Sequence, residues 1–184
     1  GRYRTLLRDV VRKQLQAIVE NEKQLRTEKL STRSVAVFPL KYQGTDERYA
    51  PLSKGLSEMM LIDLGQVKSL TVIERIRTEE LLNELKFGQT EYVDRSTAPR
   101  LGKFLSAGRV VAGTYNVRSN SIRMDVAAWD VVNRRFPELT SKADDIDNLF
   151  KIEKDLVFGI IGEMGITLTQ EERVTSVLPV RKVA

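Results

Sequence analysis

The apolar positions among the first thirty residues predict one long amphipathic helix. They recur at helical spacing, and after Gly1 no Gly or Pro interrupts them. The first half of this helix is also basic. We expect it to pack against the rest of the chain or to continue an upstream helical region. The alternative is a helix that docks on a partner or lies on a membrane surface. The apolar positions are Tyr3, Leu7, Val10, Val11, Leu15, Ile18 and Leu25, and the basic ones are Arg2, Arg4, Arg8, Arg12 and Lys13.

Two short β-branched runs with a helical pattern between them predict a βαβ unit. The runs are residues 34–40 and 69–74, and a polar loop over 41–49 follows the first. Residues 51–66 carry an apolar stripe typical of a helix. Because a connection of this length crosses over the sheet, we expect the two strands to be parallel. The stripe consists of Leu52, Leu56, Met59, Met60 and Leu64.

The middle of the chain predicts two helices joined by a loop. Residues 77–85 form the first, with acidic residues in its first turn, where the helix dipole favours them. The loop 86–100 leads into the second, which Asp94 or Ser96 is expected to cap. This helix should end near Gly108, in a left-handed conformation.

The carboxy-terminal part predicts three strands and a final helix. The strands 109–117, 121–132 and 135–143 are joined by short polar turns, which indicates an antiparallel meander. Residues 146–164 form the last helix, and Gly165 should stop it. A capping box from Thr169 to Glu172 starts one more turn.

These elements predict a mixed α/β (α+β) fold. A βαβ unit precedes an antiparallel three-strand meander in one mixed sheet, and helices pack on that sheet. Residues 1–32 are expected to be an amphipathic helical extension. Residues 33–175 should form the α/β domain, and residues 176–184 a tail.

The composition removes several classes of chemistry. The chain has no Cys and no His, which excludes thiol nucleophiles, His-based relays and nearly all structural zinc sites. The net charge is +5, with 30 basic and 25 acidic side chains. This modest surplus allows an anionic partner without requiring one. No apolar run is long enough to span a membrane.

Two further groups of residues are compatible either with a binding site or with purely structural roles. Asp144, Asp145 and Asp147 precede the last helix and could hold a divalent cation, but capping explains them more simply. Basic residues on the meander could bind nucleic acid, although no aromatic strand pattern accompanies them. These are Arg118, Arg123, Arg134 and Arg135. We expect no catalytic residues, no cofactor, no metal and no nucleic-acid partner.

Several segments, taken in order, resemble one known family. They are "VAVFPL", "GLSEMM", "VIER" and "LGKFLSAGRVVAGTY". The chain from 34 to 173 resembles the CsgG family, whose type member is the curli production assembly/transport component. The resemblance implies a periplasmic α/β domain related to the TolB amino-terminal-like domains of envelope lipoproteins. It also implies service in envelope secretion or assembly rather than catalysis.

The resemblance has departures that change the expected role. The long hairpins with which the curli component forms its pore have no counterpart here, and its lipid-bearing Cys is absent. We therefore expect a protein-binding or assembly domain associated with the outer membrane through regions outside this chain. Its partners would be envelope proteins, including copies of itself. The alternatives are a lipoprotein-type regulator that activates a cell-wall or flagellar partner and, less favoured, a nucleic-acid-binding domain.

The resemblance draws attention to the pair Glu74-Arg75 at a strand-to-helix junction. Chemically, Glu74 could accept amide protons of the helix, and Arg75 could bridge to a neighbouring carboxylate. An interface role is the alternative. Phe87 and Tyr92 lie on the polar loop that follows, where aromatic residues often mark contacts. For Phe87, a hydrophobic cap on the helix is equally compatible. The candidate interface is therefore Glu74, Arg75, Phe87 and Tyr92.

Overall fold

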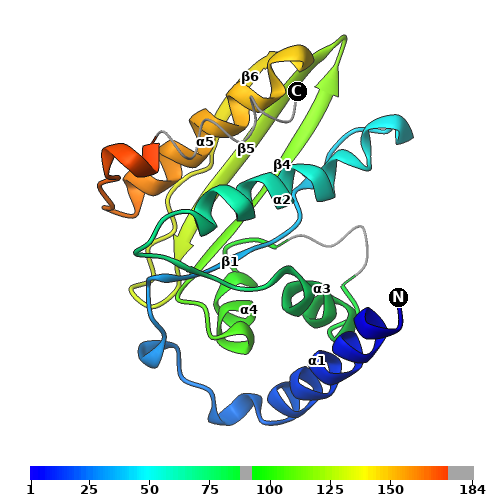
Figure 1. Ribbon diagram of the computed structural model, residues 1–184, viewed down its shortest axis with the longest axis vertical. Coiled ribbons are helices and arrows are strands. Elements are labelled where there is room, and N and C mark those ends of the chain that lie inside the picture. The colour runs from blue at the N-terminus through cyan, green and yellow to red at the C-terminus, as the bar shows by residue number, and fades with distance from the viewer. Residues whose placement is uncertain (88–92, 174–184) are drawn as a thin grey trace.

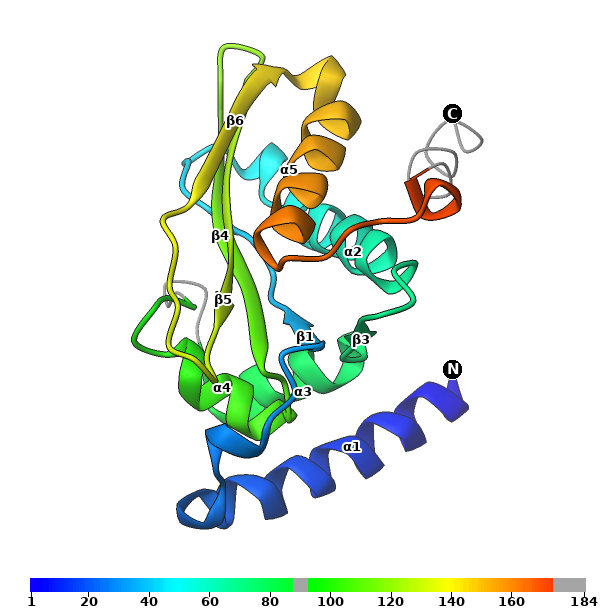
Figure 2. The same cartoon turned by 90° about the vertical axis from the view of Figure 1, so that its left-hand side faces the viewer.

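The computed structural model describes residues 1–87 and 93–173, which form three layers. A sheet lies between two sets of helices (Figures 1 and 2). The helices are α1 (Arg2–Glu20), α2 (Leu52–Gly65), α3 (Arg75–Glu84), α4 (Ala98–Leu105) and α5 (Leu149–Glu163). The strands are β1 (Ser34–Val37), β2 (Lys41–Tyr42), β3 (Thr71–Val72), β4 (Arg109–Arg118), β5 (Ser121–Asp130) and β6 (Thr140–Asp145). Short 3₁₀ turns lie at Glu22–Gln24, Thr27–Lys29, Glu47–Tyr49 and Ile146–Asn148.

The sheet is mixed, which confirms the predicted fold class. Its strand order is β3-β1-β4-β5-β6, and β2 pairs with β4. The strands β3, β1 and β4 are parallel, so the predicted βαβ unit is confirmed. The strands β4, β5 and β6 are antiparallel, as expected for the meander. The two halves meet at β4.

Two hydrophobic clusters cover the two faces of the sheet. On one face, α2 and α5 pack against alternate residues of β5, such as Met124 and Val126. On the other face, α1, α3 and α4 pack against Ala127 and Trp129 of the same strand. Neighbouring residues in the second half of β5 thus lie in opposite clusters, as the side-chain period of two in a strand requires. Leu15 of α1 is fully buried in the second cluster.

Three predicted boundaries in the first half of the chain are wrong. The amino-terminal helix ends at Glu20 instead of near residue 30, because the side-chain amide of Asn21 donates to the carbonyl oxygen of Ala17 and closes the last turn. Two 3₁₀ turns follow. The predicted loop 41–49 contains β2, whose backbone pairs with β4. The second strand is confined to Thr71–Val72.

The predicted end of α4 is also wrong. Ser106, not Gly108, adopts the left-handed conformation, with φ of 55°. Gly108 serves another purpose: its N–H donates to the carbonyl oxygen of Ser31 over 3.0 Å. A Cβ at Gly108 would overlap that backbone. At the start of α4 the cap position is Thr97, and the Asp94 carboxylate accepts from the N–H groups of Ser96 and Thr97.

The carboxy-terminal elements agree with the sequence more closely. The third meander strand lies at Thr140–Asp145 instead of 135–143, and Arg135 contributes only an isolated bridge to Asp130. Gly165 stops the last helix with φ of 74°, as predicted. Thr169 and Glu172 exchange the two hydrogen bonds of the predicted capping box. The predicted tail, 176–184, lies outside the described residues.

Gly113 is expected to be the glycine of the sheet that tolerates substitution least. A Cβ there would overlap the backbone carbonyl of Asp125 on the paired strand β5. Gly113→Ala should therefore lower the free energy of unfolding, by roughly 1–3 kcal/mol for such overpacking. Gly55→Ala is the matched control, because Gly55 is exposed in α2 with open space around its Cβ position. It should stabilise by about 0.5–1 kcal/mol. Urea titration of both variants measures this, and equal effects would contradict it.

Candidate protein-interaction site

The pair Glu74-Arg75 lies where the chain passes from β3 into α3. Glu74 is the residue before the helix, and Arg75 is its first residue. Both are exposed. The helix thus begins two residues earlier than predicted, so Glu79 and Glu80 lie beyond its first turn. The Glu74 side chain makes no capping hydrogen bond. The prediction that Glu74 accepts amide protons of the helix is therefore wrong.

Arg75 bridges two helices through carboxylates. Its guanidinium pairs with Glu58 of α2, and its Nε lies 3.3 Å from Oε1 of Glu79 one turn further along α3. The prediction that Arg75 bridges to a neighbouring carboxylate is confirmed. The side chains of Arg75 and Glu58 are 46% and 43% exposed. Since solvent screens such pairs, each contributes at most about 1 kcal/mol to stability.

The same charges extend to α1. Arg8 donates from Nη2 to Glu79 and from Nη1 to Glu80, each over 3.0 Å. These two hydrogen bonds raise the pKa of Arg8. Glu79 therefore receives one guanidinium from its own helix and one from α1. These connected ion pairs link α1, α2 and α3 to one another.

A pocket opens beside Arg75, between α2 and α3. It lies just beyond the carboxyl end of β1. The two neighbours of β1 in the sheet are β3, which the chain reaches through α2 on one face, and β4, which it reaches through α3 and α4 on the other face. In open α/β sheets, ligands bind preferentially at such a position. Apolar and charged side chains both line the pocket. A ligand there could contact apolar side chains and also the ion pairs that Arg75 forms with Glu58 and Glu79. The pocket is lined by Val37, Pro39, Lys54, Ser57, Glu58, Leu61, Arg75, Thr78 and Glu79.

Phe87 lies at the opposite end of α3 from Arg75. Its N–H donates to the carbonyl oxygen of Leu82, and the N–H of Lys86 donates to Asn83. Lys86 has φ of 56°, so the helix closes with the two hydrogen bonds of a Schellman motif. Phe87 is half-buried against the second hydrophobic cluster. This is the geometry of a hydrophobic helix cap. Tyr92 lies outside the described residues, and the interface role of both aromatics stays a prediction.

The structure reveals a buried charged cluster that sequence reasoning missed. Asp63 of α2 is 2% exposed, and Glu153 of α5 is fully buried. The Lys154 Nζ lies 2.5 Å from Oδ1 of Asp63 and 3.8 Å from Oε2 of Glu153. One signal was present in the sequence, since Glu153 lies three residues before Leu156 and therefore on the apolar face of its helix.

Some residues of the two other kinds of site have structural roles. Asp145 accepts from the N–H of Asp147 over 2.9 Å at the turn before α5, which is the predicted capping role. Within 1–87 and 93–173, no group of three or more acidic residues is placed to hold a metal ion. On the meander, Arg123 forms an ion pair with Asp125 at 3.1 Å. No helix in the same ranges is both long and apolar enough to cross a membrane.

The solved structures that are similar to this chain share little of its sequence. No curated protein matches the chain. Among solved structures, the LpoB carboxy-terminal domain of Salmonella enterica has 13% identity and a TM-score of 0.48, covering 71% of this chain and 95% of that one. A Neisseria meningitidis lipoprotein has 15% identity and a TM-score of 0.42, covering 74% and 99%.

The family comparison covers the region that contains the site. The model described as curli production assembly/transport component CsgG matches residues 19–121, more than half of the chain. This match runs from the end of α1 to the start of β5, and it includes Arg75 and every residue that lines the pocket. The chain therefore belongs to the CsgG family.

Proposed function

We propose that this chain is a non-catalytic protein-binding or assembly domain of a bacterial cell-envelope secretion or assembly system. The observation that carries the proposal is the family match over residues 19–121, whose description names a component of assembly and transport. Membership of this family supports an envelope-associated role in binding other proteins. The proposed assembly role does not include a pore, because this sequence has no counterpart of the pore-forming hairpins of the curli component. The domain would work in the periplasm, on the outer-membrane side, without a cofactor.

The pocket beside Arg75 is the proposed contact surface. Its ion pairs are half-exposed, so a charged group of a partner can replace Glu58 at Arg75 without burying an unpaired charge. The apolar residues Val37, Pro39 and Leu61 supply area that a partner side chain can cover. The loop after α3, with Phe87 and Tyr92, would form a second contact. The proposed partners of the domain are envelope proteins, including copies of the same chain.

Reversing the charge of Arg75 should weaken partner binding while leaving the fold stable. In Arg75→Glu the new carboxylate faces Glu58 and Glu79, so a partner group that needs a cation there is repelled. The measurement is photo-crosslinking in a bacterial envelope fraction, from a photoreactive residue placed at Lys54 on the pocket rim. We expect a defined crosslinked protein that Arg75→Glu reduces at least tenfold.

The controls separate a binding role from a structural one. Arg95→Glu breaks another exposed ion pair, with Glu138, and its side chain is 46% exposed, like that of Arg75. This variant should keep the crosslink. A photoreactive residue at exposed Lys142 on β6 should give none. If Arg75→Glu lowers the melting temperature far more than Arg95→Glu, Arg75 is structural. Light scattering then shows whether the crosslinked protein is a second copy.

A further inference from the structure

The first three turns of α1 carry an exposed apolar stripe. Tyr3 is 78% exposed, Leu6 58%, Leu7 38% and Val10 53%. Their spacing of three and four residues places them on one side of the helix. Further along, Val11 and Leu15 are buried in the second hydrophobic cluster. The second half of this apolar pattern therefore packs on the domain, whereas the first half belongs to neither hydrophobic cluster of the described residues.

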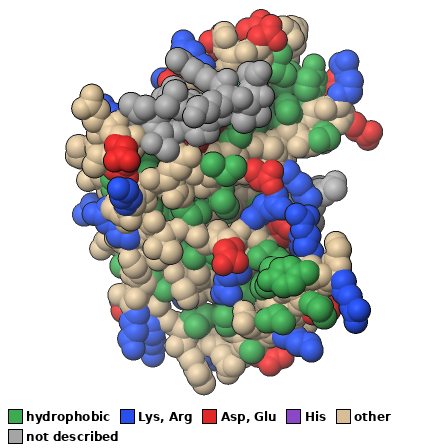
Figure 3. All heavy atoms as spheres, viewed as in Figure 1, with side chains coloured by type: hydrophobic (Ala, Val, Ile, Leu, Met, Phe, Trp, Pro, Cys, Tyr) green, Lys and Arg blue, Asp and Glu red, His purple; other side chains and the backbone are tan. Residues whose placement is uncertain are grey.

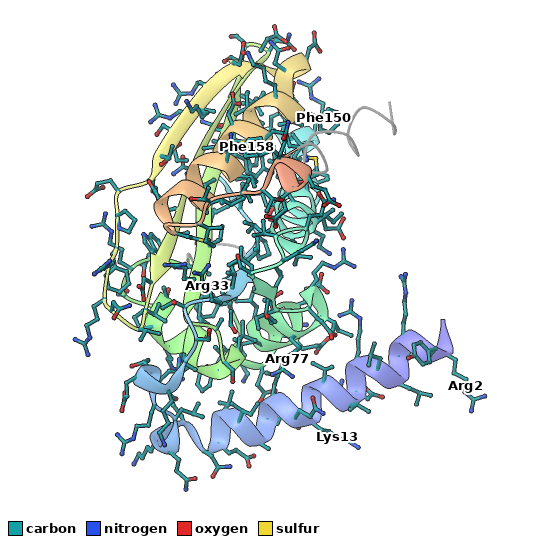
Figure 4. The ribbon with its side chains drawn as sticks, turned by 60° about the vertical axis from the view of Figure 1, so that its left-hand side comes forward. Arg2, Lys13, Arg33, Arg77, Phe150 and Phe158 are labelled. Carbon is teal, nitrogen blue, oxygen red and sulfur yellow. The ribbon has the colours of Figure 1, made fainter. Side chains whose placement is uncertain are left out.

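Cations flank this stripe. Arg8 and Arg12 form ion pairs with described carboxylates, whereas Arg2, Arg4 and Lys13 form none within the described ranges. Figure 4 shows Arg2 and Lys13 extending from α1 away from the sheet. In Figure 3, hydrophobic and basic side chains lie next to each other at the lower right, where Figure 1 places the amino-terminal half of α1.

We propose that the amino-terminal half of α1 lies on an anionic lipid surface, with the apolar stripe inserted at the interface. A helix with an apolar side and a Lys/Arg-rich flank is the pattern of interfacial helices. A second copy of this chain fits poorly, because two such helices would bring their unpaired cations together. This membrane contact goes beyond the proposed protein-binding function. It also replaces the expectation that membranes are reached only through regions outside this chain.

The helix is already in place for such binding. Arg8 ties it to Glu79 and Glu80 of α3, and the buried Leu15 fixes its second half. A preformed helix avoids the ordering entropy that a disordered segment loses when it binds. Residues 2–13 span roughly 17 Å at about 1.5 Å per residue, so their stripe can lie flat along a membrane surface.

Vesicle sedimentation with the intact chain tests the proposal. Vesicles of equal parts phosphatidylglycerol and phosphatidylcholine should bind the chain, and added salt should weaken that binding. Vesicles of phosphatidylcholine alone should bind it far less. The triple variant Arg2→Glu, Arg4→Glu, Lys13→Glu should lose on the order of a hundredfold in affinity. Leu6→Glu with Val10→Glu should lose at least about tenfold.

The matched control places the same charges on exposed apolar residues elsewhere. Ile62→Glu with Leu139→Glu, at 55% and 39% exposure, should bind vesicles as tightly as the parent chain. Circular dichroism confirms that each variant keeps its helices. No binding to the anionic vesicles would overturn the proposal, as would equal losses in the control. A dimer that only the stripe variants abolish would overturn it in favour of a second copy. The crosslink from Lys54 does not depend on this stripe, so the proposed function can stand if the membrane contact fails.

Discussion

Replacing Lys154 with methionine should destabilise the fold by about 3–5 kcal/mol, the usual cost of breaking a buried ion pair from one side. The Lys154 Nζ lies 2.5 Å from Oδ1 of Asp63, a carboxylate that is only 2% exposed between α2 and α5. Methionine keeps the apolar stem but removes the positive charge. Asp63 would then be buried without a counter-charge. Urea unfolding at neutral pH, followed by circular dichroism, measures the loss.

A second substitution on the opposite helix should restore most of that stability. Asp63→Asn combined with Lys154→Met removes both charges, so the double variant should be more stable than Lys154→Met alone. Arg123→Met is the matched control. It breaks an ion pair with Asp125 in which the Arg123 side chain is 63% exposed, and it should cost less than about 1 kcal/mol. If Lys154→Met costs no more than Arg123→Met, the buried pair does not stabilise the fold.

The sheet was predictable because its information lies in local patterns. The alternation along β5 places Met124 and Val126 on one face and Trp129 on the other, as the structure has them. The connection through α2 required parallel strands. Element ends were less predictable, because they depend on contacts with distant parts of the chain. Gly108 is an example: it looks like a helix stop, but its lack of a side chain permits close approach to Ser31.

The candidate site was predictable only in part, for a similar reason. The chemistry of Arg75 indicates a carboxylate partner, but only the packing of α2 against β3 selects Glu58. Glu74 occupies the cap position of α3 but makes no capping hydrogen bond, because Glu is not among the shorter polar residues that usually cap helices. The exposure of Tyr3 and Val10 depends on where the domain surface ends beneath α1, which no periodicity reveals. Asp63 and Lys154 pair across two helices although they lie 91 residues apart in the chain.

Glu153 should make the protein less stable as the pH rises. Both its oxygens are buried and, as a carboxylate, Glu153 finds no donor for either of them within the described residues. Burial, then hydrogen bonding to Asp63 and repulsion from it, raise the pKa of Glu153 from 4.5 to about 9, against the opposing effect of Lys154. Gln66, which directly follows α2, also has a buried oxygen without a donor among the described residues. At neutral pH Glu153 is therefore protonated, and its proton can be shared with Asp63.

The sign of the pH dependence follows from the two pKa values. Below pH 4.5 both the folded and the unfolded chain hold the proton, so Glu153 adds no pH dependence. Between 4.5 and about 9 only the folded chain holds it. Each pH unit in that window then lowers the free energy of unfolding by about 1.4 kcal/mol at most. Glu153→Gln supplies a neutral side chain at every pH. Its stability advantage should grow across the window and level off above it.

Urea unfolding of the parent chain and of Glu153→Gln at several pH values from 5 to about 9 measures this advantage. Glu163→Gln is the matched control, because Glu163 is exposed on the same helix. It should leave the pH dependence of the parent chain unchanged. If the curves of Glu153→Gln and the parent run parallel, Glu153 carries no extra proton in the folded state. A difference that grows with pH, together with the loss in Lys154→Met, would show that α2 and α5 are held by a cluster with one positive charge, one negative charge and one shared proton.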